Sequence, residues 1–172
     1  MRTKAFLSFL LACGLLDAQN NLTTTANQRY FNGVRRNLEA AADVMPADKY
    51  GYRMTPGQMT FAEWLNHSSD RNYTDCAALK SEPVPDAGKK PITLTEKNAV
   101  MQTLKDSLAY CAAAFQAIDD QKVLSTPQMS YSFLHVIVHN NEIYGNISGY
   151  LRLNGIVPPS TAARMKQSET KK

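Results

Sequence analysis

Apolar side chains recur at helical spacing along most of this chain. The first such stretch begins near Ala26 and ends at Pro46, and residues three or four positions apart in it form one apolar stripe. The stripe consists of Phe31, Val34, Leu38, Ala41 and Met45. We expect an amphipathic helix here, preceded by a flexible polar lead over residues 19–25.

A second helix is predicted from Thr60 onward. Thr60 and Glu63 have the T-x-x-E spacing of a capping box, in which each side chain accepts a hydrogen bond from a free amide at the helix start. The stripe that follows consists of Phe61, Leu65, Ser68, Asn72, Cys76 and Leu79. Residues 82–88 (EPVPDAG) are too rich in proline and glycine for a helix. A link of this length allows the third helix to run parallel to the second.

The third and fourth helices have similar signals. Thr93 and Glu96 repeat the capping-box spacing, which predicts the start of the third helix. Its stripe consists of Val100, Leu104, Leu108, Cys111, Phe115 and Ile118. The fourth helix is expected to begin after Ser125-Thr126-Pro127 and to end at Gly155. Its stripe consists of Met129, Phe133, Ile137, Tyr144, Ile147 and Leu151.

The pattern predicts an all-α fold, because no segment alternates in the way that strands do. Four helices of about 18–25 residues are typical of an antiparallel-type four-helix bundle. We therefore expect one domain over residues 26–160, followed by a polar C-terminal tail over residues 161–172.

The first eighteen residues have the three parts of a secretory signal peptide. Arg2 and Lys4 precede a short apolar run, and the chain turns polar from Asp17. The apolar run is too short to span a bilayer, so we expect no integral membrane span. We expect the signal peptide to be cleaved after Ala18 and the protein to be periplasmic or secreted. An alternative is that residues 10–13 (LLAC) form a lipobox, which would make the protein a lipoprotein anchored through Cys13.

Export bears on the two remaining cysteines. Cys76 and Cys111 lie on the apolar stripes of different helices, and paired thiols persist as a disulfide in an oxidising compartment. We expect the two to pair. The alternative is that each is buried separately and packs as a small hydrophobic side chain.

The charge of the chain excludes one class of partner. The net charge of +4 falls to +3 without residues 1–18, which carry two positive and one negative side chain. The basic residues are dispersed and no basic stripe is interleaved with aromatic residues, so nucleic acid is not an expected partner. A small molecule is the expected partner, and the sequence leaves a homodimer open.

The candidate metal ligands are the three histidines. His67 lies on the flank of the apolar stripe of the second helix. Around the fourth helix, counting 100° per residue, His139 lies about 110° and His135 about 150° from the centre of the apolar stripe. We therefore expect His139 to border the core and His135 to face solvent. Ile143, one turn after His139, stands where a second ligand would point the same way but cannot bind a metal. Glu142 is a less well-directed alternative, and each histidine could equally serve only in packing.

Several segments resemble one known family, the DinB-like (YfiT-like) superfamily of metal-dependent four-helix-bundle proteins, and in particular its exported bacterial members. The resemblance covers most of the chain after residue 18. The segments that carry it are residues 45–50 (MPADKY), Thr55-Pro56, residues 61–67 (FAEWLNH), Cys76, Tyr110-Cys111, residues 139–145 (HNNEIYG) and residues 150–160 (YLRLNGIVPPS).

The resemblance implies an up-down-down-up bundle that holds a divalent metal such as Zn²⁺ or Ni²⁺ and acts as a hydrolase or thiol transferase. One ligand would come from the second helix and two from the fourth, at His67, His139 and position 143. Ile143 departs from this pattern, so His67 and His139 are the expected ligands, with Glu142, His135 or water completing the site. The alternative is a non-catalytic bundle that binds a small molecule or a protein in the same cleft, made more apolar by Ile143.

Overall fold

The computed structural model describes residues 21–170, and all the regular secondary structure in that range is helical. Four long helices are joined by shorter ones. The long helices are α1 (Leu22–Val44), α2 (Phe61–Lys80), α3 (Lys97–Ala117) and α5 (Pro127–Leu153), and the others are η1 (Ala47–Lys49), η2 (Asp86–Gly88), α4 (Asp120–Val123) and α6 (Pro159–Glu169). The expected signal peptide and Cys13 lie outside the described residues.

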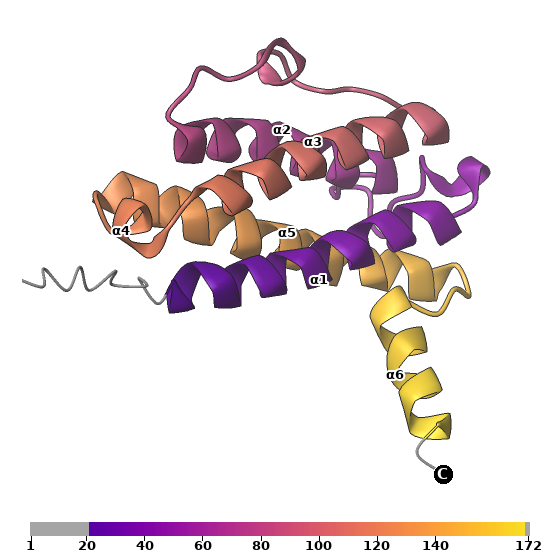
Figure 1. The fold of residues 1–172 in the computed structure, drawn as a ribbon. Helices are drawn as coiled ribbons and strands as arrows, with labels where there is room; N and C mark the ends of the chain where they lie inside the picture. Colours follow the sequence, from indigo (N-terminus) through magenta and orange to yellow (C-terminus); the bar gives the residue numbers. More distant parts are fainter. Residues whose placement is uncertain (1–20, 171–172) are drawn as a thin grey trace, which may run out of the picture.

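The four long helices lie along one another (Figure 1). α1 and α2 each pack against both α3 and α5. α2 and α3 run in the same direction, because the connection between them returns over the length of α2 (Figure 1). No helix in this part of the chain is long and apolar enough to cross a membrane.

One hydrophobic core joins the four long helices. The predicted apolar stripes supply most of it, and burial of each large apolar side chain contributes about 1.5–3 kcal/mol. Its largest fully buried apolar side chains include Phe31, Leu38, Phe61, Leu65, Leu104, Leu108, Phe115, Ile143 and Ile147.

The predicted capping box at the start of α2 is confirmed. The Glu63 amide donates to Thr60 Oγ1 over 3.1 Å, and the Thr60 amide donates to Glu63 Oε2 over 2.6 Å. The predicted ends of the fourth helix are also confirmed: Thr126 caps α5 by accepting from the Met129 amide, and Gly155 follows α5 with a positive φ of 73°.

The predicted start of the first helix is wrong by several residues. α1 already begins at Leu22, inside the stretch that the sequence indicated as a flexible lead. The amides of Thr23 and Thr24 donate to the two carboxylate oxygens of Asp120 over 3.0 and 2.7 Å. This cap comes from α4, almost a hundred residues away, so no local pattern reveals it.

The second predicted capping box does not form. α3 begins at Lys97 after Glu96, which makes no side-chain cap. Thr93 instead lies in a segment without regular secondary structure that α2 holds in place: the Asn66 amide group donates to the Leu94 carbonyl over 2.8 Å, and the Ile92 amide donates to Asp70 over 3.1 Å. These tertiary contacts fix the chain at the predicted cap.

The predicted polar tail is helical for most of its length. α6 begins with Pro159 at its first position, a residue whose fixed φ suits a helix start. It projects from the end of α5 (Figure 1), and none of its residues is buried. Its contact with the body includes the Tyr144 hydroxyl, which donates to Ser160 Oγ over 2.9 Å.

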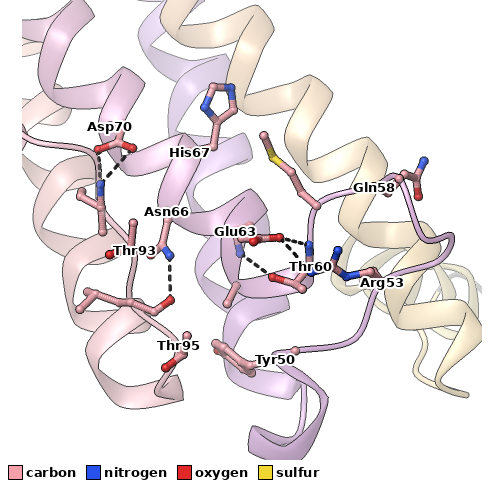
Figure 2. Close-up of a pocket in the computed structure, with 16 residues that line it drawn as sticks. Tyr50, Arg53, Gln58, Thr60, Glu63, Asn66, His67, Asp70, Thr93 and Thr95 are labelled. Atoms are coloured by element: carbon pink, nitrogen blue, oxygen red, sulfur yellow. Dashed lines mark hydrogen bonds and ion pairs between the residues drawn. The ribbon is translucent and has the colours of Figure 1, made fainter.

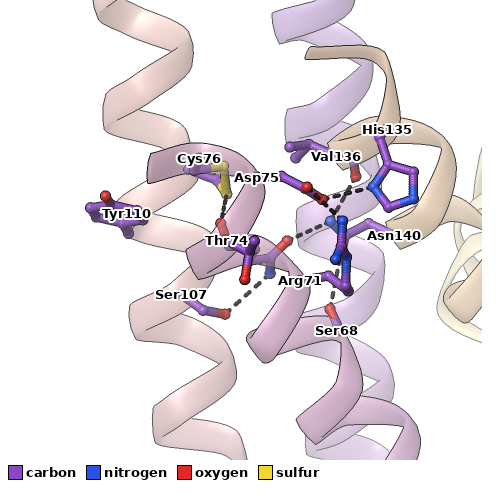
Figure 3. The surroundings of a disulfide bond; sticks show 12 residues. Ser68, Arg71, Thr74, Asp75, Cys76, Ser107, Tyr110, His135, Val136 and Asn140 are labelled. Carbon is purple, nitrogen blue, oxygen red and sulfur yellow. Dashed lines mark hydrogen bonds and ion pairs between the residues drawn. A yellow bond between two sulfur atoms is a disulfide. The ribbon is translucent and has the colours of Figure 1, made fainter. Parts of the chain in front are cut away.

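The predicted pairing of the cysteines is confirmed by the geometry. Cys76 of α2 and Cys111 of α3 form a disulfide with a Cα–Cα distance of 5.2 Å, and both residues are fully buried (Figure 3). The bond links the two neighbouring helices that run in the same direction.

Candidate functional site

All three histidines meet where α2 faces α5. The rings of His67 and His139 are nearly perpendicular, with centroids 4.8 Å apart. The ring of His135 also contacts His139: the two rings stack with centroids 5.1 Å apart and an interplanar angle of 11°. The expectation that His135 faces solvent is therefore wrong, since its ring is half-buried against that of His139.

A buried carboxylate explains the position of His135 (Figure 3). His135 Nδ1 lies 2.7 Å from Oδ2 of Asp75, which is only 4% exposed. The other oxygen of Asp75 accepts from Arg71 Nη2 over 2.7 Å, across one turn of α2. The carboxylate favours the tautomer with a proton on Nδ1 and leaves the lone pair on Nε2, an arrangement common in histidines that ligate metals.

His139 occupies the centre of the cluster, between His67 and His135. Its Nε2 atom is buried and has no hydrogen-bond partner among the described residues. Burial, followed by the nearby His67, His135 and Arg71, lowers the pKa of His139 to about 4. His139 is thus neutral at pH 7, and one of its two ring nitrogens has a lone pair available to a metal ion.

Aromatic side chains cover both ends of the row of imidazole rings. Tyr131 stacks on His135 with centroids 5.1 Å apart, and Trp64 meets His67 edge-on at 6.5 Å. The Trp64 indole donates to the Tyr150 hydroxyl over 3.0 Å, which fixes its orientation. The row therefore has a wall on each side.

Position 143, where the resemblance implies a ligand, and the alternative ligand Glu142 do not join the cluster. Ile143 is fully buried in the hydrophobic core, and Glu142 is exposed. Among residues 21–170, no group of three or more histidine, cysteine, aspartate or glutamate side chains is already placed to hold a metal ion. The structure brings His67, His139 and His135 close together without converging their nitrogens.

A cavity of about 630 Å³ opens beside His67, between α2 and two connections that precede and follow it (Figure 2). Its walls are mixed, with Thr60, Glu63 and Asp70 beside apolar side chains. Asn66 also lines it; the residue is only 3% exposed and its Oδ1 atom has no hydrogen-bond partner in the described part of the chain. Burial raises the pKa of Asp70, although its bond from the Ile92 amide opposes the change.

Buried polar side chains link α2 to α3 and α5 (Figure 3). Ser68 Oγ donates to Asn140 Oδ1 over 2.6 Å, and the Asn140 amide donates to Asn72 Oδ1 over 2.6 Å. The Asn72 amide in turn donates to Ser107 Oγ over 3.1 Å. This chain of bonds ties α5 to α2 and α2 to α3, and thereby fixes the helices that carry the histidines.

Sequence reasoning placed Ser68 and Asn72 on a buried stripe but missed their bonding, and it missed Asp75 entirely. The spacing of Arg71 and Asp75, one turn apart, was the available signal, because it is typical of an ion pair on a helix.

Comparison with protein-family models, with curated proteins and with solved structures finds no match for this chain.

Proposed function

We propose that the protein is an exported DinB-like metalloprotein that binds a divalent ion between α2 and α5, with His67 and His139 as ligands. The observation that carries this proposal is the Nε2 atom of His139, which is buried and has no hydrogen-bond partner among the described residues. The centroid of the His139 ring lies 4.8 Å from that of His67. A buried polar atom without a partner lowers the stability of the fold by about 1–3 kcal/mol. A metal ion is a possible partner, because an imidazole nitrogen can donate its lone pair to it.

The arrangement of the helices supports the family part of the proposal. α2 and α3 run in the same direction, and α5 runs opposite to them beside α1 (Figure 1). This order of directions supports the proposal of an up-down-down-up four-helix bundle. The long connection after α2 is what such an order requires.

A hydrolase or transferase reaction is the proposed use of the site. A divalent ion supplies Lewis acidity and lowers the pKa of water when bound. The cavity beside His67 is where a substrate would bind, against the polar side chains of Thr60, Glu63 and Asp70 in its wall. Trp64 and Tyr131 lie against His67 and His135 at the two ends of the row of imidazoles.

Metal content is the test. The protein is purified without chelator or affinity-tag histidines and analysed for elements beside the double variant His67→Ala, His139→Ala. The control is Glu142→Ala, which changes an exposed carboxylate next to the cluster. We expect about one ion per chain in the wild type and the control and none in the double variant. A wild type that takes up no added Zn²⁺, Ni²⁺ or Co²⁺ would refute metal binding.

A second candidate function is a catalytically silent binding protein, and one observation favours it. The cavity with the free Asn66 Oδ1 atom exists independently of any metal. Ile143 does not line it, so the ligand would meet the mixed polar and apolar walls of this cavity and not the more apolar cleft expected from the sequence. A protein that binds no metal but loses ligand binding on Asn66→Leu would support this candidate.

Export is proposed from the sequence of the first eighteen residues together with the disulfide. Mass spectrometry of the mature protein tests it. An unmodified Gln19 at the N-terminus would support secretion by signal-peptide cleavage, and a lipidated Cys13 would support the lipoprotein alternative.

A further inference from the structure

We infer that the cavity beside His67 binds a small organic amine, and that the carboxylate of Asp70 receives the ammonium group of this ligand. The inference rests on the proposed use of the cavity as the substrate site and names the class of substrate. Binding of the amine requires no metal ion, so it can be tested separately from the binding of metal.

Asp70 has no cation to balance its charge within residues 21–170. Its two oxygens accept from the Ile92 amide over 3.1 and 3.3 Å, and no lysine or arginine of the described chain forms an ion pair with it. His67 attracts the carboxylate, but an imidazole carries no permanent charge. The carboxylate is half-buried in the wall of the cavity, where a charge without a partner destabilises the fold. A bound cation would offset this loss.

The other permanent charges in the wall of the cavity are already paired. Arg53 is the one lysine or arginine among the residues that line it, and Arg53 Nη2 lies 3.7 Å from Glu63 Oε2. Glu63 also accepts from the Thr60 amide in the capping box (Figure 2). The charge that remains unmatched is the single negative charge of Asp70, which favours a ligand with one positive group.

The shape of the cavity suits a ligand with an aliphatic part. Glu63 and Asp70 both line it from α2 (Figure 2), and at 1.5 Å per residue they lie about 10 Å apart along the helix. The lining also includes the apolar side chains of Met59, Ile92 and Leu94. The volume of about 630 Å³ is typical of small-molecule sites. An amine held at Asp70 can therefore place its carbon chain against apolar wall.

The hydrogen bonds of Asp70 leave room for an ammonium group. A carboxylate has about four lone-pair sites, so the bonds from the Ile92 amide leave acceptor capacity for further donors. Bonds between an ammonium group and a carboxylate are about twice as strong as bonds between neutral groups. An alcohol would bond to the same oxygens without this gain, and a carboxylate ligand would be repelled.

The experiment compares three probes of equal chain length, n-pentylamine, 1-pentanol and pentanoate, on the metal-free protein with its disulfide intact. Binding at neutral pH is followed by the ¹H–¹⁵N NMR signals of Ile92 and Leu94, which lie in the wall of the cavity. Asp70→Asn removes the charge and keeps an oxygen that can accept from the Ile92 amide. The matched control is Asp106→Asn, which changes an exposed aspartate of α3 outside the cavity. Circular dichroism identifies any variant that fails to fold.

We expect pentylamine to shift both signals with a dissociation constant on the order of 1–10 mM, because so small a probe makes few contacts. Pentanol and pentanoate should bind at least about tenfold more weakly. Asp70→Asn should weaken the binding of pentylamine by at least about tenfold, and Asp106→Asn should leave it unchanged.

Three results would overturn this inference: no binding of pentylamine, equal binding of pentanol, or unchanged binding of pentylamine to folded Asp70→Asn. If Asp70→Asn does not fold, the comparison of the three probes on the wild type still decides whether the charge is recognised. None of these results alters the outcome of the metal analysis. A wild type that binds pentylamine as expected but takes up no metal would overturn the proposed metalloprotein and leave this inference standing.

Discussion

At the scale of single residues, burial of His139 makes stability depend on pH. The pKa of its imidazole is about 4 in the folded protein and about 6.5 in an unfolded chain. Between these values the unfolded chain binds more protons, so the free energy of unfolding rises with pH. The stability that the neutral His139 imidazole contributes is fully present above pH 6.5 and is lost as the pH falls toward 4. We expect a loss of about 1–2 kcal/mol, after discounting the shift for partial exposure.

Urea unfolding of the metal-free protein between pH 7.5 and 4 measures this effect. The control is His139→Gln, which removes the titrating group, and the difference between the two curves isolates its contribution. Parallel curves for the two proteins would contradict the lowered pKa of His139.

Ile143→His tests the position that the family resemblance reserves for a ligand. Because Ile143 is fully buried in the apolar core, a histidine there should lower the free energy of unfolding by about 2–3 kcal/mol. Position 143 is one turn from His139, so saturating Co²⁺ should restore part of the lost thermal stability. Thermal unfolding with and without Co²⁺ checks both parts. No gain from the metal would show that a side chain at 143 does not reach His139.

The histidines also show how far a sequence can locate a site. Counting 100° per residue placed His139 at the border of the core, where the structure has it. The same count put His135 in solvent, because it describes the direction of the Cα–Cβ bond and not what the ring can reach. Asp75, on another helix, holds that ring, and no local pattern places it there.

At the scale of helices, the capping box predicts a measurable contribution to stability. Thr60→Ala removes the acceptor for the Glu63 amide and should lower the free energy of unfolding by about 1 kcal/mol. Thr93→Ala is the matched control, since its predicted cap does not form and the residue lies outside any helix. Urea unfolding at pH 7 should show a change within about 0.5 kcal/mol for the control. Equal effects of the two substitutions would contradict a role for the cap.

Helix interiors were easier to predict than helix ends. The apolar stripes of α1, α2, α3 and α5 are properties of each segment alone, so the sequence sufficed for them. The start of α2 was predictable for the same reason, because its cap lies within four residues. The starts of α1 and α3 depend on Asp120, Asp70 and Asn66, which are distant in sequence.

At the scale of the whole molecule, Asn140 should have the largest effect of the buried polar residues. Its amide group bonds to both Ser68 and Asn72 of α2. Asn140→Leu would leave both partners buried without their bonds and should lower the free energy of unfolding by about 2–4 kcal/mol. Asn141→Ala, which changes the exposed neighbour, should alter it by less than about 0.5 kcal/mol. An Asn140 variant as stable as the wild type would show that packing alone aligns α2 with α5.

The relation between helices was only partly predictable. The length of the 82–88 link and its neighbours indicated that α3 could run parallel to α2, as Figure 1 shows. The sequence did not reveal that Ser68, Asn72 and Asn140 bond to one another, because polar residues on apolar stripes have no partner until the helices are packed. The meeting of three histidines has the same cause.

The disulfide has a mechanical consequence. A force that pulls the two ends of the chain apart would pass from α2 to α3 through the bond between Cys76 and Cys111 and not through the residues between them. The 35 peptide steps that it bypasses correspond to about 120 Å of extended chain, at about 3.3–3.6 Å per residue. This shielded length includes residues 92–95, which form one wall of the cavity. Under tension that wall would remain a closed loop until the bond is reduced.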